Sequence, residues 1–221
     1  MNKKYIYLSH FLTPNTPTYG DRDKFSIQEN SSISKGDTAN SFSMNFSTNH
    51  MGTHIDLPKH FFGDGKSLND FDPDYWFYNN VSVVDIPKGN GELIIPEDFL
   101  NSGIDENCDI LLIRTGFERY RKEKTYWEEN PGIDPSVADF LRSEYPKIRT
   151  IGFDFISLTS FQHRELGKEA HRKFLGGEND FITIIEDMHL SDLNSSPRKI
   201  VLLPILISGI DASPITIIAE L

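Results

Sequence analysis

The segment His50-Met51-Gly52-Thr53-His54-Ile55-Asp56-Leu57-Pro58-Lys59-His60 holds three of the seven histidines of the chain. His50, His54, Asp56 and His60 all stand at even positions, which project to one face of an extended chain. A continuous helix is a poor alternative here, because a glycine and a proline interrupt it and two of the intervening residues are β-branched. Three imidazoles and one carboxylate are therefore expected to converge.

Imidazole nitrogens and carboxylate oxygens are the usual protein ligands of zinc and manganese. A single histidine beside a core face is usually a structural residue. Four metal-competent side chains on one face favour metal binding over a structural hydrogen-bond cluster. Two or three ligands on one short segment form only half a site, so we expect the remaining ligands elsewhere in the chain.

The composition is that of an ordinary soluble protein. The chain has 221 residues, of which 38% are hydrophobic and 25% charged, and this size fits a single domain spanning residues 1–221. A formal charge of -11 repels phosphate backbones and anionic lipid surfaces, so neither nucleic acid nor a membrane is an expected partner. The longest apolar stretch, residues 200–207, is too short for a membrane span and contains a proline.

The only cysteine, Cys108, excludes a disulfide framework and is expected to be structural. The N-terminus has no extended apolar region of the kind that a signal peptide requires. We therefore expect the protein in the reducing cytoplasm.

Hydrophobic patterning predicts strands and helices that alternate along the chain. Residues 13–37 are rich in turn-forming residues and are expected to be a long loop with room for one short strand. Residues 41–47 alternate polar and apolar side chains, which predicts a half-buried strand. Further strands are expected at residues 5–8, 81–86, 109–114, 150–154, 181–186, 199–207 and 214–219, and helices at 96–100, 135–145 and 164–175. This order indicates a mixed α/β domain, and the few helices and the missing phosphate loop argue against a nucleotide-binding fold.

The full pattern His-x-Gly-Thr-His-x-Asp-x-Pro-x-His resembles the signature of the cyclase-like family of metal-dependent hydrolases, which includes bacterial kynurenine formamidase and the isatin hydrolases. Residues 8–10, 17–21, 112–116, 151–157, 170–172, 184–186 and 209–214 resemble further segments of that family. In the last strand, Thr216 stands where the family commonly has arginine. The resemblance implies an α/β fold, with a single mixed-sheet domain of the kynurenine formamidase (swivelling β/β/α) type.

The resemblance also implies roles for individual residues. In the family, the first two histidines and the aspartate of the signature bind metal, and its last histidine, here His60, is the proton shuttle. A downstream histidine and glutamate complete a site for one or two ions, with Zn²⁺ expected and Mn²⁺ possible. The implied metal ligands are His50, His54, Asp56, His171 and Glu186. His10, His163 and His189 receive no role.

The implied reaction is hydrolysis of an amide, formamide or lactam C–N bond by metal-activated water, as in an arylformamidase. The substrate would be a small molecule, often aromatic, and Phe61 and Trp76 are the aromatic residues that we expect to line its pocket. Two alternatives stay open: a lyase or cyclase that uses the metal as a Lewis acid, and a non-catalytic metal-binding protein. Family members commonly assemble, so a homo-oligomer, either dimer or tetramer, is expected.

Overall fold

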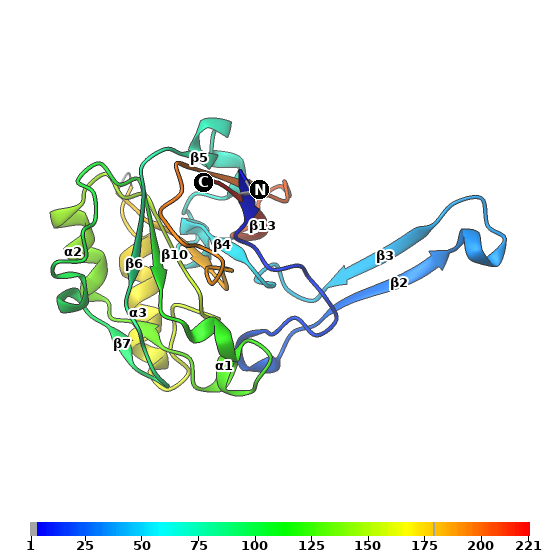
Figure 1. The fold of residues 1–221 in the computed structure, drawn as a ribbon, viewed down its shortest axis with the longest axis horizontal. Helices are drawn as coiled ribbons and strands as arrows, with labels where there is room; N and C mark the ends of the chain where they lie inside the picture. Colours follow the sequence, from blue (N-terminus) through cyan, green and yellow to red (C-terminus); the bar gives the residue numbers. More distant parts are fainter. Residues whose placement is uncertain (1–3, 179) are drawn as a thin grey trace.

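The computed structural model describes residues 4–178 and 180–221. Among these residues, a nine-stranded mixed sheet organises the fold (Figure 1). Eight strands follow one path across the sheet, and β1 (Tyr5–Tyr7) pairs with β13 beside that path. In spatial order the eight are β5 (Phe77–Tyr78), β12 (Lys199–Pro204), β13 (Ala212–Glu220), β4 (His54–Asp56), β11 (Thr183–Glu186), β10 (Thr150–Phe153), β8 (Ile110–Arg114) and β6 (Val81–Asp85).

The short strand β4, which is the second half of the histidine segment, lies between β11 and β13 and is antiparallel to both. Strands β6, β8, β10 and β11 are parallel to one another. The register places Glu186 directly opposite His54. Directly opposed side chains lie on the same face of a sheet and are close neighbours. Two of the implied metal ligands therefore meet through strand pairing alone.

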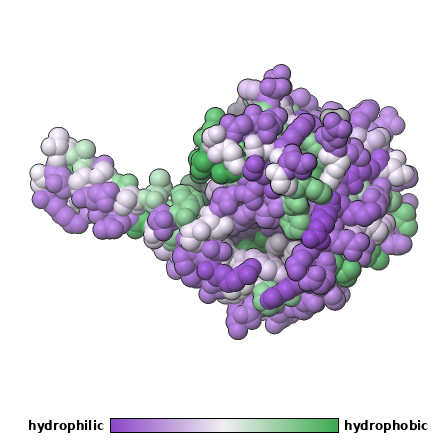
Figure 2. Space-filling model, turned by 180° about the vertical axis from the view of Figure 1, so that it is seen from behind, coloured by the Kyte–Doolittle hydropathy of each residue, from purple (hydrophilic) through white to green (hydrophobic). Residues whose placement is uncertain are grey.

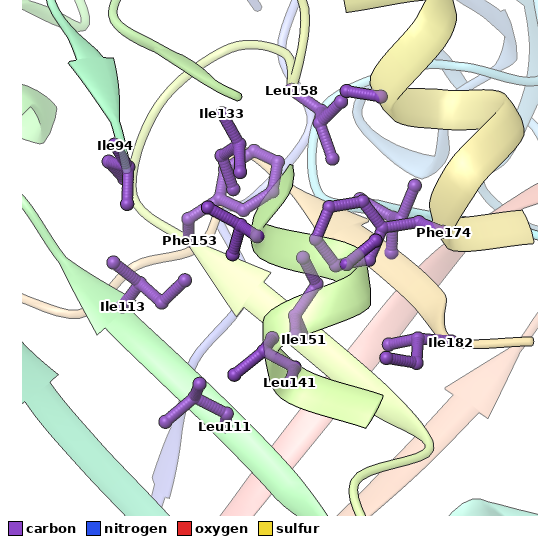
Figure 3. Packing of buried hydrophobic residues seen from close by; sticks show 14 of the residues in the cluster. Ile94, Leu111, Ile113, Ile133, Leu141, Ile151, Phe153, Leu158, Phe174 and Ile182 are labelled. Carbon is purple, nitrogen blue, oxygen red and sulfur yellow. The ribbon is translucent and has the colours of Figure 1, made fainter. Parts of the chain in front are cut away.

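Hydrophobic cores cover both faces of the parallel strands. Leu111 and Ile113 face the core beneath α2 (Ser136–Glu144) and α3 (Arg164–Leu175), and Figure 3 shows them in the cluster that also contains Phe153 and Phe174. Their neighbours in β8 belong to the core on the opposite face. This alternation is the period-2 pattern of a strand that is buried on both sides.

The connections contain a small parallel sheet and several single turns of helix. The small sheet pairs β7 (Leu93–Ile94) with β9 (Gly132–Ile133), and α1 is the four-residue helix Thr125–Glu128. The 3₁₀ turns are η1 (Tyr19–Asp21), η2 (Ile33–Lys35), η3 (Pro58–His60), η4 (Leu68–Asp70), η5 (Pro73–Trp76), η6 (Pro96–Phe99) and η7 (Phe117–Tyr120). Among the residues that the structure describes, no helix has the length and apolar character that crossing a membrane requires.

A two-stranded arm projects away from the body of the molecule (Figure 1). It consists of β2 (Phe25–Ser31) and β3 (Ser41–Phe46), which pair only with each other. The strand predicted at 41–47 is present as β3, but the expectation that it is half-buried is wrong, since Phe42 and Met44 are 54% and 64% exposed. The alternation is real, but no second layer formed by the described residues covers the apolar face. The expected loop at 13–37 also contains all seven residues of β2.

The predicted helices at 135–145 and 164–175 are confirmed within two residues, whereas residues 96–99 form a 3₁₀ turn. The predicted core strands are present, although β12 ends at Pro204 and β13 begins at Ala212. The very short elements β5, β7, β9 and α1 were not predicted, because two to four residues carry no readable period.

Candidate metal centre

The histidine segment is held in a bent conformation rather than as one extended run. Gly52 has φ +61°, a left-handed value that favours glycine, and its carbonyl oxygen accepts a hydrogen bond of 2.8 Å from Nδ1 of His54. A carbonyl can only accept, so Nδ1 carries the proton and Nε2 of His54 is left with a free lone pair. Only residues 54–56 form a strand, and His60 ends the 3₁₀ turn η3. The predicted convergence therefore arises from a bend, a strand and a turn.

Asp56 lies at the centre of the candidate site, with only 1% of its surface exposed. Its Oδ1 atom is 3.0 Å from Nδ1 of His50 and 3.5 Å from Nε2 of His54. Its Oδ2 atom is 3.6 Å from Nε2 of His171. One carboxylate therefore contacts three imidazoles, which reach it from two sides.

Glu186 provides a second shared carboxylate. Its Oε2 atom is 3.4 Å from Nε2 of His54, and its Oε1 atom is 3.6 Å from Nε2 of His171. The backbone N–H of Leu158 donates a 2.8 Å hydrogen bond to Oε1, and the Ser157 hydroxyl donates a longer one of 3.2 Å. These bonds fix the carboxylate in place while both of its oxygens face imidazoles.

Helix α3 delivers His171 from the opposite side. Its buried residues are Gly167, Ala170, His171, Phe174 and Leu175, which is the spacing of one helical face. The Gly167 carbonyl accepts a 2.8 Å hydrogen bond from Nδ1 of His171, so Nε2 is again the nitrogen free to bind a cation. The amphipathic pattern of the helix thus positions a ligand-type side chain.

The electrostatics of the site are those of a centre that holds positive charge. Burial alone would lower the pKa of His50, but the charges and hydrogen bonds of Asp56 and Asp211 together outweigh it and raise that pKa to about 10. His171 behaves in the same way, with burial opposed by Asp56 and Glu186, and its pKa rises to about 9. Although burial would raise the pKa of Asp56, His50, His171 and His60 together hold it well below its usual range. The protonated imidazoles thus provide the positive charge that a bound cation would provide at the same place.

The donor set fits a divalent metal. Nε2 of His54 and Oδ1 of Asp56 are fully buried without a hydrogen-bond partner. Buried polar atoms in proteins are otherwise nearly always paired, so a coordinated ion is a natural partner for both. His50, His54 and Asp56 each offer an atom within 4.8 Å of the others, as do Asp56, His60 and His171. Nitrogen and oxygen donors at this spacing suit zinc or manganese.

Asp211 is a site residue that the sequence did not reveal. Nδ1 of His60 lies 2.8 Å from its Oδ2 atom, and Nε2 of His50 lies 3.3 Å from the same oxygen. These two hydrogen bonds lower the pKa of Asp211, so the carboxyl is ionised at neutral pH. The tail at 209–214 resembles a family segment, but an aspartate in a turn gives no sign of contacting a residue 151 positions away.

A cavity of ≈ 450 Å³ opens onto this cluster. Phe61 lines it and stacks on His171, with ring centroids 4.9 Å apart and planes at 16°. Trp76, the other expected pocket wall, does not lie here. It packs in the core beside Phe71 and Tyr75 and borders a different cavity of ≈ 510 Å³. The correction follows from the 3₁₀ turn η5, which turns this side chain towards the sheet.

The comparison with protein families confirms the predicted membership: the chain belongs to the Cyclase family. The family model, described as "Putative cyclase", matches residues 6–159, which include the whole histidine segment.

Individual relatives and solved structures agree with this assignment. An uncharacterized protein of Methanocaldococcus jannaschii is 34% identical over 175 residues, which are 78% of each chain. Kynurenine formamidase of Bacillus cereus (strain ATCC 14579) is 28% identical over 216 residues, covering 96% of this chain and 95% of the relative. Isatin hydrolase A from Labrenzia aggregata, solved with benzyl benzoate, superposes with a TM-score of 0.82 at 22% identity, covering 98% of this chain and 93% of that one. The predicted α/β fold of the kynurenine formamidase type is confirmed.

Proposed function

We propose that this chain is a metal-dependent hydrolase that cleaves an amide, formamide or lactam C–N bond of a small aromatic substrate. The observation that carries the proposal is the pair of buried carboxylates, Asp56 and Glu186, each of which contacts imidazoles from two structural elements. The relatives support the reaction class, since several named kynurenine formamidase align with 96% of the chain. We treat residues 1–221 as a single hydrolase domain of this kind.

The proposed metal ligands are His50, His54, Asp56, His171 and Glu186, which could hold one or two ions. Zn²⁺ is the ion that we propose first, with Mn²⁺ as the alternative. When bound, a divalent ion lowers the pKa of a coordinated water towards about 7 and polarises a substrate carbonyl. The two backbone carbonyls that hold the Nδ1 protons keep His54 and His171 in the tautomer that binds metal through Nε2.

His60 is the proposed proton carrier. Its Nδ1 atom is held by the ionised Asp211, which leaves Nε2 to take up and release a proton. An imidazole nitrogen can both accept and donate a proton, so His60 can take a proton during attack on the carbonyl and return it to the leaving nitrogen. Asp211 fixes the ring orientation and stabilises its protonated form, as the carboxylate of a catalytic triad does.

The cavity lining supports an aromatic substrate with an acidic group. Phe61 and Tyr19 supply aromatic surface for a flat ring. Arg22, Arg164 and Lys168 also line the cavity, although the chain as a whole is strongly acidic. We propose that these cations attract a carboxylate on the substrate, because guanidinium and ammonium groups at a cavity mouth concentrate anions there.

We also propose that the chain forms a homo-oligomer in which the β2–β3 arm contacts a second copy. Ile27, Phe42 and Met44 lie on one face of the arm and are 47%, 54% and 64% exposed, and Figure 2 shows hydrophobic surface along this arm. A two-stranded hairpin is marginal in water without a packing partner. Phe11 and Leu206 leave apolar surface on the body as well, at 81% and 82% exposure, which a second arm could cover.

A triple variant with serine at positions 27, 42 and 44 tests the arm. The wild type is expected to sediment as a dimer or tetramer at micromolar concentration, and the variant as a monomer with an unchanged far-ultraviolet spectrum. A monomeric wild type would refute the assembly but not the hydrolase.

The chemistry is tested with a panel of N-formylkynurenine, formanilide, isatin and simple esters. We expect turnover of at least one formamide or lactam, its loss after chelation, and its recovery on adding Zn²⁺ or Mn²⁺.

The family name and a solved relative described as having cyclase activity keep a lyase or cyclase as the second candidate. Turnover that releases no acid and consumes no water would favour a lyase or cyclase.

We place the enzyme in the cytoplasm, where the buried Cys108 stays reduced.

A further inference from the structure

A second cluster of ligand-type side chains lies outside the proposed hydrolytic site. It joins His10, which follows β1, with Glu118 in η7 and His189, which follows β11. Among the described residues, it is the one group of three potential ligand atoms within 4.8 Å that shares no member with the metal centre. None of the three residues has a part in the proposed hydrolytic reaction.

The backbone builds this cluster from three distant segments. Ser9 and Met188 form an antiparallel bridge, and the N–H of His189 donates a 2.9 Å hydrogen bond to the Leu8 carbonyl. This pairing brings the rings of His10 and His189 to a centroid distance of 5.0 Å.

Glu118 is fixed between the two rings. Its Oε2 atom accepts hydrogen bonds of 3.0 and 2.9 Å from the backbone N–H groups of Leu190 and Ser191. The other oxygen, Oε1, contacts Nδ1 of His189 and is 3.6 Å from Nε2 of His10. A single oxygen therefore faces both imidazoles.

His10 carries the same signature as the ligands of the hydrolytic site. Its Nε2 atom is buried without a hydrogen-bond partner, as are Nε2 of His54 and Oδ1 of Asp56. Only 15% of the His10 side chain is exposed, so water has little access to satisfy that nitrogen. An unpaired buried nitrogen is unfavourable, and a coordinated ion would satisfy it.

The surroundings favour a cation. Nε2 of His189 lies 3.2 Å from Asp192, so a carboxylate can hold the Nε2 proton and leave Nδ1 to bind metal. Arg121 carries a positive charge that would oppose cation binding at this cluster. Its hydrogen bonds of 2.8 and 2.7 Å to the buried Asp187 offset that charge. His10 borders a separate cavity of ≈ 310 Å³, through which an ion could enter.

We propose that His10, Glu118 and His189 form a second zinc site. Two imidazoles and one carboxylate are a common zinc ligand set, with water as the fourth ligand. Zinc about 2.0–2.1 Å from each ligand in tetrahedral geometry places ligand atoms about 3.3 Å apart, close to the 3.6 Å between His10 and Glu118. Nδ1 of His189 and Oε1 of Glu118 are in direct contact, so these two atoms would separate when the ion binds. The ion would tie three chain segments together behind the histidine segment, where the Thr53 hydroxyl accepts a hydrogen bond from the His10 backbone.

The test is the zinc content of purified protein after exposure to ZnCl₂ and removal of free metal. His10→Gln and His189→Gln are each expected to bind one zinc ion fewer per chain than the wild type. His163→Gln is the matched control, because that exposed histidine belongs to no cluster among the described residues and should bind as much zinc as the wild type. His54→Gln separates the two sites, since it should lose zinc at the hydrolytic centre and retain this ion.

Zinc should also raise the melting temperature of the His54→Gln variant. The increase should be smaller in the double variant that carries both His54→Gln and His10→Gln. Equal zinc content in the wild type, His10→Gln and His189→Gln, with all three folded by circular dichroism, would overturn the second site. A His54→Gln variant that loses no zinc would instead count against the hydrolytic site, so the two failures are distinguishable.

Discussion

The substitution Asp211→Asn separates the residue that orients His60 from those that hold the metal. Asp211 accepts from His60 at 2.8 Å through Oδ2 and from the Asn49 side chain at 2.8 Å through Oδ1. The two donors reach different oxygens, and asparagine replaces one of these oxygens with an NH₂ group, so one donor loses its acceptor. The change also removes the negative charge that favours protonated His60.

The expected loss is one charge-assisted hydrogen bond. Such bonds contribute about 1.5–3 kcal/mol, and the low end applies because the His60 and Asp211 side chains are 28% and 32% exposed. About 1.5 kcal/mol corresponds to a rate roughly tenfold lower. We therefore expect kcat for a formamide substrate to fall about tenfold, with zinc content at the hydrolytic centre unchanged.

The assay compares kcat and zinc content for the wild type, Asp211→Asn and Asp98→Asn. Asp98 is a similarly half-buried aspartate that pairs with Lys88, so its variant controls for loss of a surface charge and should match the wild type. If Asp211→Asn lost zinc in proportion to activity, Asp211 would be a ligand together with His50 and His60, and the reasoning would be refuted. An unchanged kcat would refute it as well.

Three further predictions follow from the site. His54→Ala should lose metal and activity together, whereas His60→Ala should keep metal and lose rate; a metal-free His60→Ala protein would disprove the shuttle role. Zinc affinity should rise with pH, because pKa values of about 10 for His50 and about 9 for His171 mean that two protons must leave below pH 9. Competition titrations should show up to about 100-fold weaker binding per pH unit lowered, and a flat profile would contradict these pKa values. Gly52→Ala should lower the free energy of unfolding by about 1–2 kcal/mol, because the backbone has a positive φ here and the added Cβ would lie only 2.5 Å from Leu12. A variant that is as stable as the wild type in urea unfolding would count against this backbone argument.

Strong local patterns in the sequence predicted much of the fold. The apolar run at 109–114 and the helical spacing at 164–175 gave elements that the structure confirms nearly residue for residue. At 41–46 the strand is confirmed, but its predicted burial is wrong. Alternation reports that one face is apolar, but it does not report whether anything within the same chain covers that face.

The candidate site shows the same division. The spacing of His50, His54 and Asp56 indicated convergence, because the residues are close in sequence. Asp211 and the His10–Glu118–His189 cluster were invisible, since strand pairing across the sheet brings these residues together and no local period encodes that pairing. Trp76 was misplaced because an aromatic run looks alike in a pocket and in a core.

Anomalous scattering at the zinc absorption edge, from crystals grown with ZnCl₂, tests the central claim most directly. We predict a strong peak within coordination distance of Asp56 and Glu186, bounded by Nε2 of His54 and His171. Active crystals with no anomalous peak between these side chains would contradict the account.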